Sequence, residues 1–306
     1  MVGSRYKDGR AGIDAELVRR LIRAQFPQWG DLPVRPVAVD GWDNRTYRLG
    51  DAMTVRLPTA AGYAPAVEKE NRWLPVLAPS LPVPVPRILG QGVPGEGYPF
   101  GWSVRGWLEG ESANRGPVDD LPGFAVSVAG FLLALQRIEA ADGPSAGAHS
   151  FHRGAPPAFY DGETRAALAA LAALAGLVDT GRAAAVWQAA LAAGWQGSPV
   201  WFHGDIASGN LLVRDGKLAA VIDFGTSGVG DPACDLVIAW TMFSGESREA
   251  FRTAVGQDAA MWARARGWAL WKALICLVEF LDRDPVTAAE HRRVLGEVLA
   301  DHDLFG

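Results

Sequence analysis

Three oxygen-bearing side chains stand where apolar segments of the sequence end. Asp205 opens a loop shortly after the apolar segment 200–202, and Asn210 closes the same loop five residues later. Asp223 directly follows a second apolar segment, 219–222. Short apolar segments bounded by polar residues are typical of buried strands, so both segments are expected to be strands that deliver these side chains to a site.

The three side chains have the chemistry that phosphoryl transfer requires. One carboxylate must accept or orient the proton of the attacking hydroxyl, and Asp205 fits this role. A carboxylate and an amide oxygen must hold Mg²⁺ against the phosphates, since Mg²⁺ prefers hard oxygen ligands. Asp223 and Asn210 fit this second role, while the spacing of Asp205 and Asn210 lets one loop place both over the same γ-phosphate.

The order of these residues resembles a known pattern. Segment 203–210 reads His-Gly-Asp-Ile-Ala-Ser-Gly-Asn, and segment 223–225 reads Asp-Phe-Gly. They are similar to the catalytic loop and the metal-binding strand end of the aminoglycoside phosphotransferase family, which is built like protein kinases. The resemblance implies an α+β, protein-kinase-like two-lobe fold, with an N-terminal antiparallel sheet lobe and a larger helical C-terminal lobe. It also implies ATP or GTP as the phosphate donor, Mg²⁺ as the cofactor and a small molecule with a hydroxyl as the acceptor.

The resemblance implies nucleotide-binding residues in the first third of the chain. Segment 41–47, which contains Asn44, looks like the family loop that covers the phosphates with backbone amides. Arg56 stands where the family has its phosphate-pairing basic residue, which is usually Lys in protein kinases. Glu70 is the helical carboxylate expected to orient Arg56, with Glu68 as the alternative.

Other residues are expected to surround the nucleotide or to support the catalytic loop. Arg105 and Trp107 lie in a strand that looks like the hinge between lobes, where backbone groups would meet the base, adenine or guanine. His203 is interpreted as an orienting residue rather than a base. Asp231 suits a helix N-cap, and Asp235 is expected to form hydrogen bonds with the loop around His203.

Residues that could bind the acceptor lie among the C-terminal helices. The candidate acids are Glu246, Glu279, Asp282 and Asp284. The last three end a long apolar helix and could attract a polyamine such as an aminoglycoside, although a solvated helix end is the alternative interpretation. The sequence contains 12 tryptophans, and a tryptophan-lined cleft would suit a bulkier, more apolar acceptor such as a macrolide.

Two other functions remain open. One is a metabolic kinase that acts on choline, homoserine or a sugar. The other is a pseudokinase that binds a nucleotide without catalysis, although the complete set of Asp205, Asn210 and Asp223 argues against it. A protein substrate is not expected, because the next predicted helix begins within about ten residues of segment 223–225 and leaves no long activation segment.

The elements that must position these residues change in character along the chain. A nucleotide-binding lobe rich in strands is expected over 1–107, and a catalytic and substrate-binding helical lobe over 108–306. Helices are predicted over 14–26, 65–77, 121–138, 163–177, 182–193, 233–243, 248–255, 258–281 and 286–300. Strands are predicted over 34–49, 52–57, 87–89, 102–108, 200–202, 211–213 and 219–222.

Composition excludes some partners. The formal net charge of −5 argues against a nucleic-acid partner, because such a protein needs a basic surface. No uncharged segment is long enough to cross a bilayer, and residues 1–12 lack an apolar signal core. We therefore expect a soluble cytoplasmic protein that does not contact membranes and is a monomer or a weak dimer. Cys234 and Cys276 are expected to be buried, reduced thiols.

Overall fold

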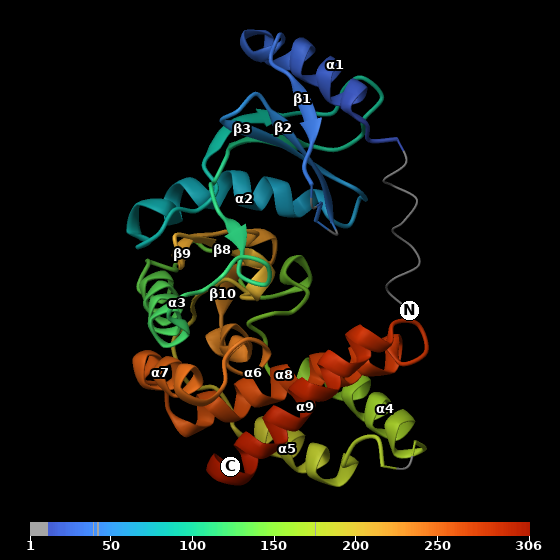
Figure 1. Ribbon diagram of the computed structural model, residues 1–306, viewed down its shortest axis with the longest axis vertical. Coiled ribbons are helices and arrows are strands. Elements are labelled where there is room, and N and C mark those ends of the chain that lie inside the picture. The colour runs from blue at the N-terminus through green and yellow to red at the C-terminus, as the bar shows by residue number, and fades with distance from the viewer. Residues whose placement is uncertain (1–11, 39, 42, 175) are drawn as a thin grey trace. The chain divides into compact units, whose positions relative to one another are not determined.

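The computed structural model describes residues 12–38, 40–41, 43–174 and 176–306 (Figure 1). The chain forms two compact units. The first comprises the described part of Met1–Gly110 together with Ala219–Gly225, and the second comprises Glu111–Leu218 and Thr226–Gly306. The sequence placed a single boundary after residue 107. The return of 219–225 to the first unit was not expected, and it makes Asp223 part of that unit.

The first unit is built on an antiparallel sheet with the strand order β1-β2-β3-β5-β4. Its strands are β1 (Val34–Pro36), β2 (Asn44–Leu49), β3 (Met53–Pro58), β4 (Ile88–Gly92) and β5 (Trp102–Gly106). The turn between β2 and β3 contains Gly50 at a φ of +59°, a left-handed conformation that favours glycine. This is the hairpin turn that the sequence predicts.

The predicted continuous strand over 34–49 is wrong, because the chain leaves the sheet between β1 and β2. The carboxylate of Asp40 accepts a hydrogen bond from the backbone N–H of Thr46 at 2.9 Å. Such a side-chain bond replaces a strand partner and stabilises a loop. Asp40 therefore explains the interruption that the apolar pattern did not reveal.

Two helices accompany this sheet. Helix α1 (Ala15–Gln25) begins after Asp14, whose carboxylate accepts from the Leu17 N–H at 2.8 Å, as the sequence predicts. The buried face of α1 packs in one apolar core with β2, β3 and β5; this core includes Leu17, Val18, Leu21, Ile22, Tyr47, Val55, Leu57, Trp102 and Val104. Helix α2 (Ala64–Leu77) tolerates Pro75 in its last turn, and it buries Glu70.

The second unit is mainly helical (Figure 1). Its longer helices are α3 (Leu121–Gln136), α4 (Asp161–Ala172), α5 (Thr180–Ala192), α7 (Gly245–Val255), α8 (Ala259–Phe280) and α9 (Pro285–Phe305). Helix α8 packs against α4, α5 and α9, and α3 packs against α7 and β7. Because α8 is surrounded by other elements, it is buried on most of its circumference, and so are its tryptophans.

Short strands in the second unit carry the loops of interest. Strand β7 (Val200–Phe202) pairs with β10 (Gly228–Gly230), and β8 (Leu211–Arg214) pairs with β6 (Glu111–Ser112). Strand β9 (Lys217–Val221) spans the boundary between the units.

The predicted α-helix over 233–243 is wrong. A 3-10 helix (Pro232–Val237) leads into the single turn of α6 (Ile238–Thr241). Asp231 caps the 3-10 helix by accepting from the Ala233 N–H at 3.1 Å, which favours the tighter winding. Cys234 and Cys276 are free and buried, as predicted. No helix among the described residues is long and apolar enough to cross a membrane.

Candidate active site

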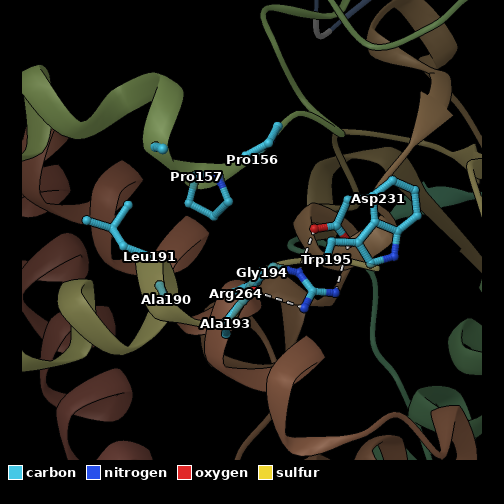
Figure 2. A pocket seen from close by; sticks show the side chains of 10 residues that line it. Pro156, Pro157, Ala190, Leu191, Ala193, Gly194, Trp195, Asp231 and Arg264 are labelled. Carbon is cyan, nitrogen blue, oxygen red and sulfur yellow. Dashed lines mark hydrogen bonds and ion pairs between the residues drawn. The ribbon is translucent and has the colours of Figure 1, made fainter. Parts of the chain in front are cut away.

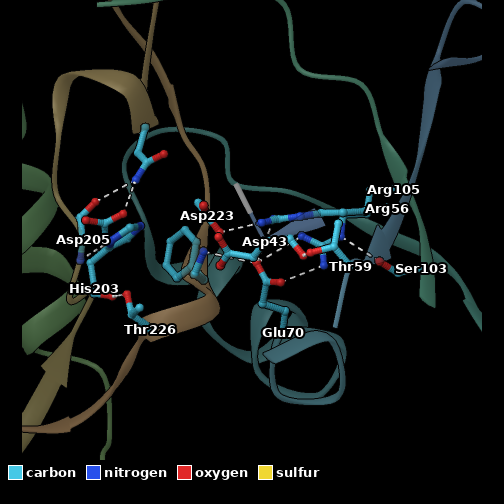
Figure 3. A network of polar contacts seen from close by, with 12 residues as sticks. Asp43, Arg56, Thr59, Glu70, Ser103, Arg105, His203, Asp205, Asp223 and Thr226 are labelled. Carbon is cyan, nitrogen blue, oxygen red and sulfur yellow. Dashed lines mark hydrogen bonds and ion pairs between the residues drawn. The ribbon is translucent and has the colours of Figure 1, made fainter. Parts of the chain in front are cut away.

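In the first unit, one buried carboxylate collects several donors (Figure 3). Glu70, on α2, is 2% exposed. Arg105, on β5, donates from Nη1 to Oε1 at 3.1 Å and from Nη2 to Oε2 at 2.8 Å. The backbone N–H of Phe224 donates to Oε1 at 3.2 Å. Burial works to raise the pKa of Glu70, but Arg105 and Arg56 outweigh burial and lower it, so the carboxylate stays ionised.

Arg56, on β3, joins this carboxylate to Asp223. Its Nη2 lies 2.6 Å from Asp223 Oδ1, and its Nη1 lies 3.4 Å from Glu70 Oε1. With the amide oxygen of Asn44 turned toward Arg56, that oxygen accepts from Nε at 3.2 Å and from Nη2 at 3.1 Å. Burial works to lower the pKa of Arg56, but the carboxylates of Asp223 and Glu70 raise it. Arg56 is thus a permanent cation between two anions, a position from which a guanidinium can bind phosphate oxygens.

Asp223 has an unusual backbone conformation. Its φ is +67°, in the left-handed region that Asp and Asn enter more readily than most residues. The next residue, Phe224, can then direct its N–H to Glu70. The Asp223 side chain is 31% exposed even though it pairs with Arg56. The Asp223 carboxylate is therefore partly exposed and has a cationic partner.

In the second unit, the loop over 203–210 is closed by its own side chains (Figure 3). The amide nitrogen of Asn210 donates to the backbone oxygen and to Oδ2 of Asp205, both at 2.9 Å. The Asp205 N–H donates to Nδ1 of His203 at 3.2 Å, consistent with an orienting role for His203. Since the Asn210 nitrogen is engaged by Asp205, the amide oxygen is the part of Asn210 that can serve as a ligand.

Asp235 fixes the start of the loop over 203–210. Its Oδ2 accepts from the His203 N–H at 2.7 Å, and its Oδ1 accepts from the Gly204 N–H at 2.6 Å. Burial raises the pKa of Asp235 to about 6, although the two backbone donors work to lower it. The hydrogen bonds that the sequence assigned to Asp235 are therefore present.

Gly204 cannot be replaced by a residue with a side chain. Its φ is +83°, and a Cβ there would lie 2.9 Å from the backbone oxygen of Thr226. The hydroxyl of Thr226 donates to the His203 backbone oxygen at 3.0 Å. The backbone after β7 is therefore held by Thr226 as well as by Asp235. The local geometry explains why the segment has Gly before Asp205.

Asp231 forms a buried ion pair with Arg264 in the second unit. It accepts from Arg264 Nε at 2.7 Å and Nη2 at 3.3 Å, and both side chains are almost fully buried. Beside the pair lies a pocket of about 50 Å³, which Pro157 and Trp195 also line (Figure 2). This volume is too small for a nucleotide. The geometry agrees with the structural role that the sequence gave to Asp231.

At the segment expected to be the hinge, the Arg105 guanidinium and the backbone N–H groups of Gly106 and Trp107 bind partners within the first unit. The Arg105 guanidinium is bound to Glu70, and the backbone N–H groups of Gly106 and Trp107 donate to Arg87 and Ala52 at 2.9 and 2.8 Å. The Trp107 ring lies under the guanidinium of Arg48, 3.8 Å from its Cζ. These two N–H groups therefore already have backbone partners. Trp42, in the loop expected over the phosphates, lies outside the described residues.

The four candidate acceptor acids have different surroundings. Glu246 is exposed in the first turn of α7. Glu279, near the end of α8, faces Arg283 at 3.8 Å, and Asp282 is exposed. Asp284 caps α9 and accepts from the Thr287 hydroxyl at 2.6 Å and from two backbone N–H groups, which lower its pKa. The carboxylate of Asp284 therefore serves to cap α9.

Two features of the site were missed by sequence reasoning. One is the side chain of Arg105 as the main partner of Glu70. The other is Arg153, whose Cβ would lie 3.2 Å from a Cβ at Gly204, and which therefore adjoins the catalytic loop. The only signal for Arg153 was a single arginine among aromatic residues in segment 151–160.

Comparisons with known proteins show the family to which the chain belongs. Residues 34–268 match the model of the phosphotransferase enzyme family (APH), and this range covers most of the chain. The protein belongs to this phosphotransferase family. No curated protein matches the sequence significantly.

Solved structures establish the fold. The GDP complex of wild-type aminoglycoside 2'-phosphotransferase-IIIa has a TM-score of 0.69 and 18% identity, covering 95% of this chain and 100% of the other. The streptomycin–ATP ternary complex of APH(2")-IIa has a TM-score of 0.61 and 16% identity, covering 94% and 96%. Macrolide 2'-phosphotransferase MphH from Brachybacterium faecium has a TM-score of 0.60 and 24% identity, covering 94% and 98%. The fold is therefore the α+β, kinase-like fold of these enzymes, as the sequence predicts.

Proposed function

We propose that this protein transfers the γ-phosphoryl group of ATP or GTP to a hydroxyl of a small molecule. The observation that carries the proposal is the closed loop in which Asn210 holds the carboxylate of Asp205 at 2.9 Å, beneath which Asp235 fixes the backbone. In the first unit, the pairing of Arg56 with Asp223 supplies a cation and a carboxylate for the nucleotide phosphates. The mechanism requires both sets of residues to meet around one triphosphate.

In the proposed reaction, Asp205 orients the acceptor hydroxyl and receives its proton. The acceptor oxygen forms a bond to the γ-phosphorus as the bond from that phosphorus to the β–γ bridging oxygen breaks. The bridging oxygen leaves on the nucleoside diphosphate, and Arg56 neutralises charge on the phosphates. Asn210 keeps the Asp205 carboxylate in place, so much of the catalytic effect comes from positioning.

The donor set fits Mg²⁺. The Asn210 amide oxygen and the partly exposed Asp223 carboxylate are hard oxygen ligands, and they would hold the ion. When bound, Mg²⁺ would neutralise charge on the nucleotide phosphates. Among the described residues, no group of three or more His, Cys, Asp or Glu could hold a metal ion by itself. Chelation of divalent cations should stop turnover, and added Mg²⁺ should restore it.

We propose an antibiotic-like acceptor, because neighbouring structures include complexes with kanamycin and gentamicin and a macrolide 2'-phosphotransferase. Aminoglycosides and macrolides are the two candidate classes. A metabolic kinase of the choline, homoserine or sugar type would instead turn over one of those alcohols. A panel of acceptors assayed with both ATP and GTP separates these functions and identifies the preferred donor.

The variant Asp205→Asn tests the proposal. We expect turnover to fall on the order of 10³-fold, because the amide cannot take the hydroxyl proton, while nucleotide affinity stays within about twofold. Asp215→Asn, at an exposed turn after β8, is the matched control and should behave as the wild type. Full activity of Asp205→Asn would refute the mechanism. Nucleotide binding without turnover of any acceptor by the wild type would favour the pseudokinase.

A further inference from the structure

One ion pair of the first unit joins two groups that the proposed mechanism needs for different ligands. Arg56 Nη2 lies 2.6 Å from Asp223 Oδ1, and both residues belong to that unit (Figure 3). In the proposed function, Arg56 neutralises the nucleotide phosphates, whereas Asp223 is a ligand of the divalent cation. While the pair is closed, each of these groups has the other as its partner. We call the Arg56–Asp223 ion pair the latch.

The closed latch makes Asp223 a poor ligand for a cation. With a guanidinium nitrogen 2.6 Å from one carboxylate oxygen, a divalent ion on the other oxygen would lie roughly 4–5 Å from that nitrogen. Like charges at that distance repel strongly. The side chains of Arg56 and Asp223 are 15% and 31% exposed, so salt screens this repulsion less than it would at the surface. Cation binding at Asp223 therefore requires Arg56 to move away.

Arg56 keeps other partners when it leaves Asp223. Its Nη1 lies 3.4 Å from Glu70 Oε1. The amide oxygen of Asn44, turned toward Arg56, accepts from Nε at 3.2 Å and from Nη2 at 3.1 Å, and Asn44 is itself buried. A guanidinium presents its donors in a rigid fork, so one edge can change partner while the other stays bound. Only the contact from Nη2 to Asp223 has to be exchanged for one to a phosphate oxygen.

Asp223 stays in place when the latch opens. The backbone N–H of the next residue, Phe224, donates to Glu70 Oε1 at 3.2 Å. Glu70 is held in turn by Arg105 through two hydrogen bonds, at 3.1 and 2.8 Å. The backbone that carries the Asp223 carboxylate is thus anchored without the help of Arg56. Opening the latch frees a carboxylate oxygen at a position that is already fixed.

We infer that the latch couples the two ligands of the site. Arg56 leaves Asp223 for the nucleotide phosphates, and Asp223 becomes a ligand of the divalent cation only after that exchange. The inference rests on the proposed function for the identity of the two ligands. Because a coupling free energy is reciprocal, a cation at Asp223 must strengthen phosphate binding by Arg56 by the same factor.

Binding of Mn²⁺ without nucleotide provides the first test. Electron paramagnetic resonance of the free ion measures the Kd for Mn²⁺. We expect Arg56→Gln to lower this Kd about tenfold or more, because Asp223 loses the competing cation. The double variant Arg56→Gln with Asp223→Asn should lose that gain, which assigns the ion to Asp223. An unchanged Kd in Arg56→Gln, no measurable binding by that variant, or a gain that persists in the double variant would overturn the inference.

A second arginine of the same sheet provides the matched control. Arg48 lies on β2, with its guanidinium carbon 3.8 Å from the ring centroid of Trp107. Arg48→Gln removes the same charge without touching the latch, so it should leave the Kd for Mn²⁺ within about twofold. The gain in Arg56→Gln should also persist in about 0.5 M KCl, where long-range fields are screened. An equal gain in Arg48→Gln, or loss of the effect in high salt, would replace the latch with a general effect of charge.

Nucleotide binding without metal tests the exchange from the other side. In protein labelled with ¹⁵N-arginine, the Nε–H signal of Arg56 is assigned by its absence from Arg56→Gln. ATP added in EDTA should shift this signal, whereas adenosine, which has no phosphate, should not. Asp223→Asn should shift the signal without any nucleotide, because a neutral amide is a weaker partner than a carboxylate. A signal that ATP leaves in place would refute the exchange.

Neither measurement depends on turnover, so the latch and the proposed function can fail separately. If no acceptor is phosphorylated but ATP shifts the Arg56 signal and Arg56→Gln gains affinity for Mn²⁺, the latch is supported and the phosphotransferase proposal fails. If an acceptor is phosphorylated while both readouts stay unchanged, the latch is refuted and the phosphotransferase proposal stands. Absence of any ATP binding, with or without Mg²⁺, would refute both.

Discussion

Arg105 and Glu70 form a two-pronged ion pair in the first unit, with side chains that are 3% and 1% exposed. Arg56 reaches the same carboxylate at a longer distance, 3.4 Å, and its side chain is 15% exposed. The stability of a buried charge depends mainly on the oppositely charged partner that lies closest to it and is buried with it. We infer that Arg105 stabilises Glu70, so that Arg56 is available to exchange Asp223 for nucleotide phosphates.

Removal of Arg105 should chiefly affect stability. Arg105→Met leaves Glu70 buried with its weaker partner, so the free energy of unfolding is expected to fall by about 3–5 kcal/mol. Urea unfolding followed by tryptophan fluorescence measures this change. The double variant Arg105→Met with Glu70→Met should recover part of the loss, because no buried carboxylate remains without its partner, while the Phe224 N–H loses its acceptor. A loss below about 1 kcal/mol in the single variant would contradict the assignment.

Removal of Arg56 should chiefly affect nucleotide use. Arg56→Gln is expected to lower kcat/KM for the nucleotide about 10- to 100-fold, because a charge-assisted contact with the phosphates is lost. The free energy of unfolding should change by only about 1 kcal/mol, since Arg105 and the Phe224 N–H still satisfy Glu70. Arg56→Lys should retain part of the activity as a point charge without the fork of the guanidinium. If Arg56→Gln lost much stability and kept its kinetics, Arg56 rather than Arg105 would be the residue that stabilises Glu70.

The features that sequence predicted well are local. The cap of α1 by Asp14 and the hairpin glycine Gly50 each depend on a few neighbouring residues. The loop from Asp205 to Asn210 is likewise short, and one hydrogen-bonded turn closes it. The residue types and their order within a few positions were therefore enough to predict these elements.

The features that sequence missed depend on distant contacts. Arg105 looked like a hinge residue, and only the approach of α2 to β5 makes it the partner of Glu70. The hydrogen bond from Thr46 to Asp40 lies where the chain interrupts the single strand predicted over 34–49. Neither contact has a periodic signature, because the partners are chosen by tertiary packing.

The pH dependence of stability and of turnover should reveal the titration of Asp235. Burial raises its pKa to about 6 from an ordinary value of 3.8, so the folded state binds this proton more tightly than the unfolded state does. Its contribution to stability is therefore fully present below about pH 4 and is lost as the pH rises through about 6. Turnover should change in the opposite direction, because a protonated Asp235 can no longer accept from both His203 and Gly204. Below pH 6 we expect kcat to fall while this group makes the fold more stable.

Asp235→Asn separates these two effects. The amide provides one acceptor for two backbone donors, so kcat at pH 7.5 should fall about tenfold or more. Unfolding free energies measured from pH 4 to pH 7 should lose the slope that Asp235 contributes, whereas the control Asp215→Asn should keep it. An identical slope in the wild type and Asp235→Asn would assign the titration to another group.

Close packing of α8 on α5 gives a matched pair of glycine variants. A Cβ at Gly267 would lie 2.4 Å from the Cβ of Ala190, far below any real contact, whereas a Cβ at Gly296 on α9 would meet nothing within 4 Å. Gly267→Ala should therefore lower the free energy of unfolding by about 1–3 kcal/mol, although alanine favours helix. Gly296→Ala should raise it by about 0.5–1 kcal/mol through helix propensity alone. Urea unfolding of both variants measures the difference, and stabilisation by Gly267→Ala would show that α8 and α5 are not in the close contact described.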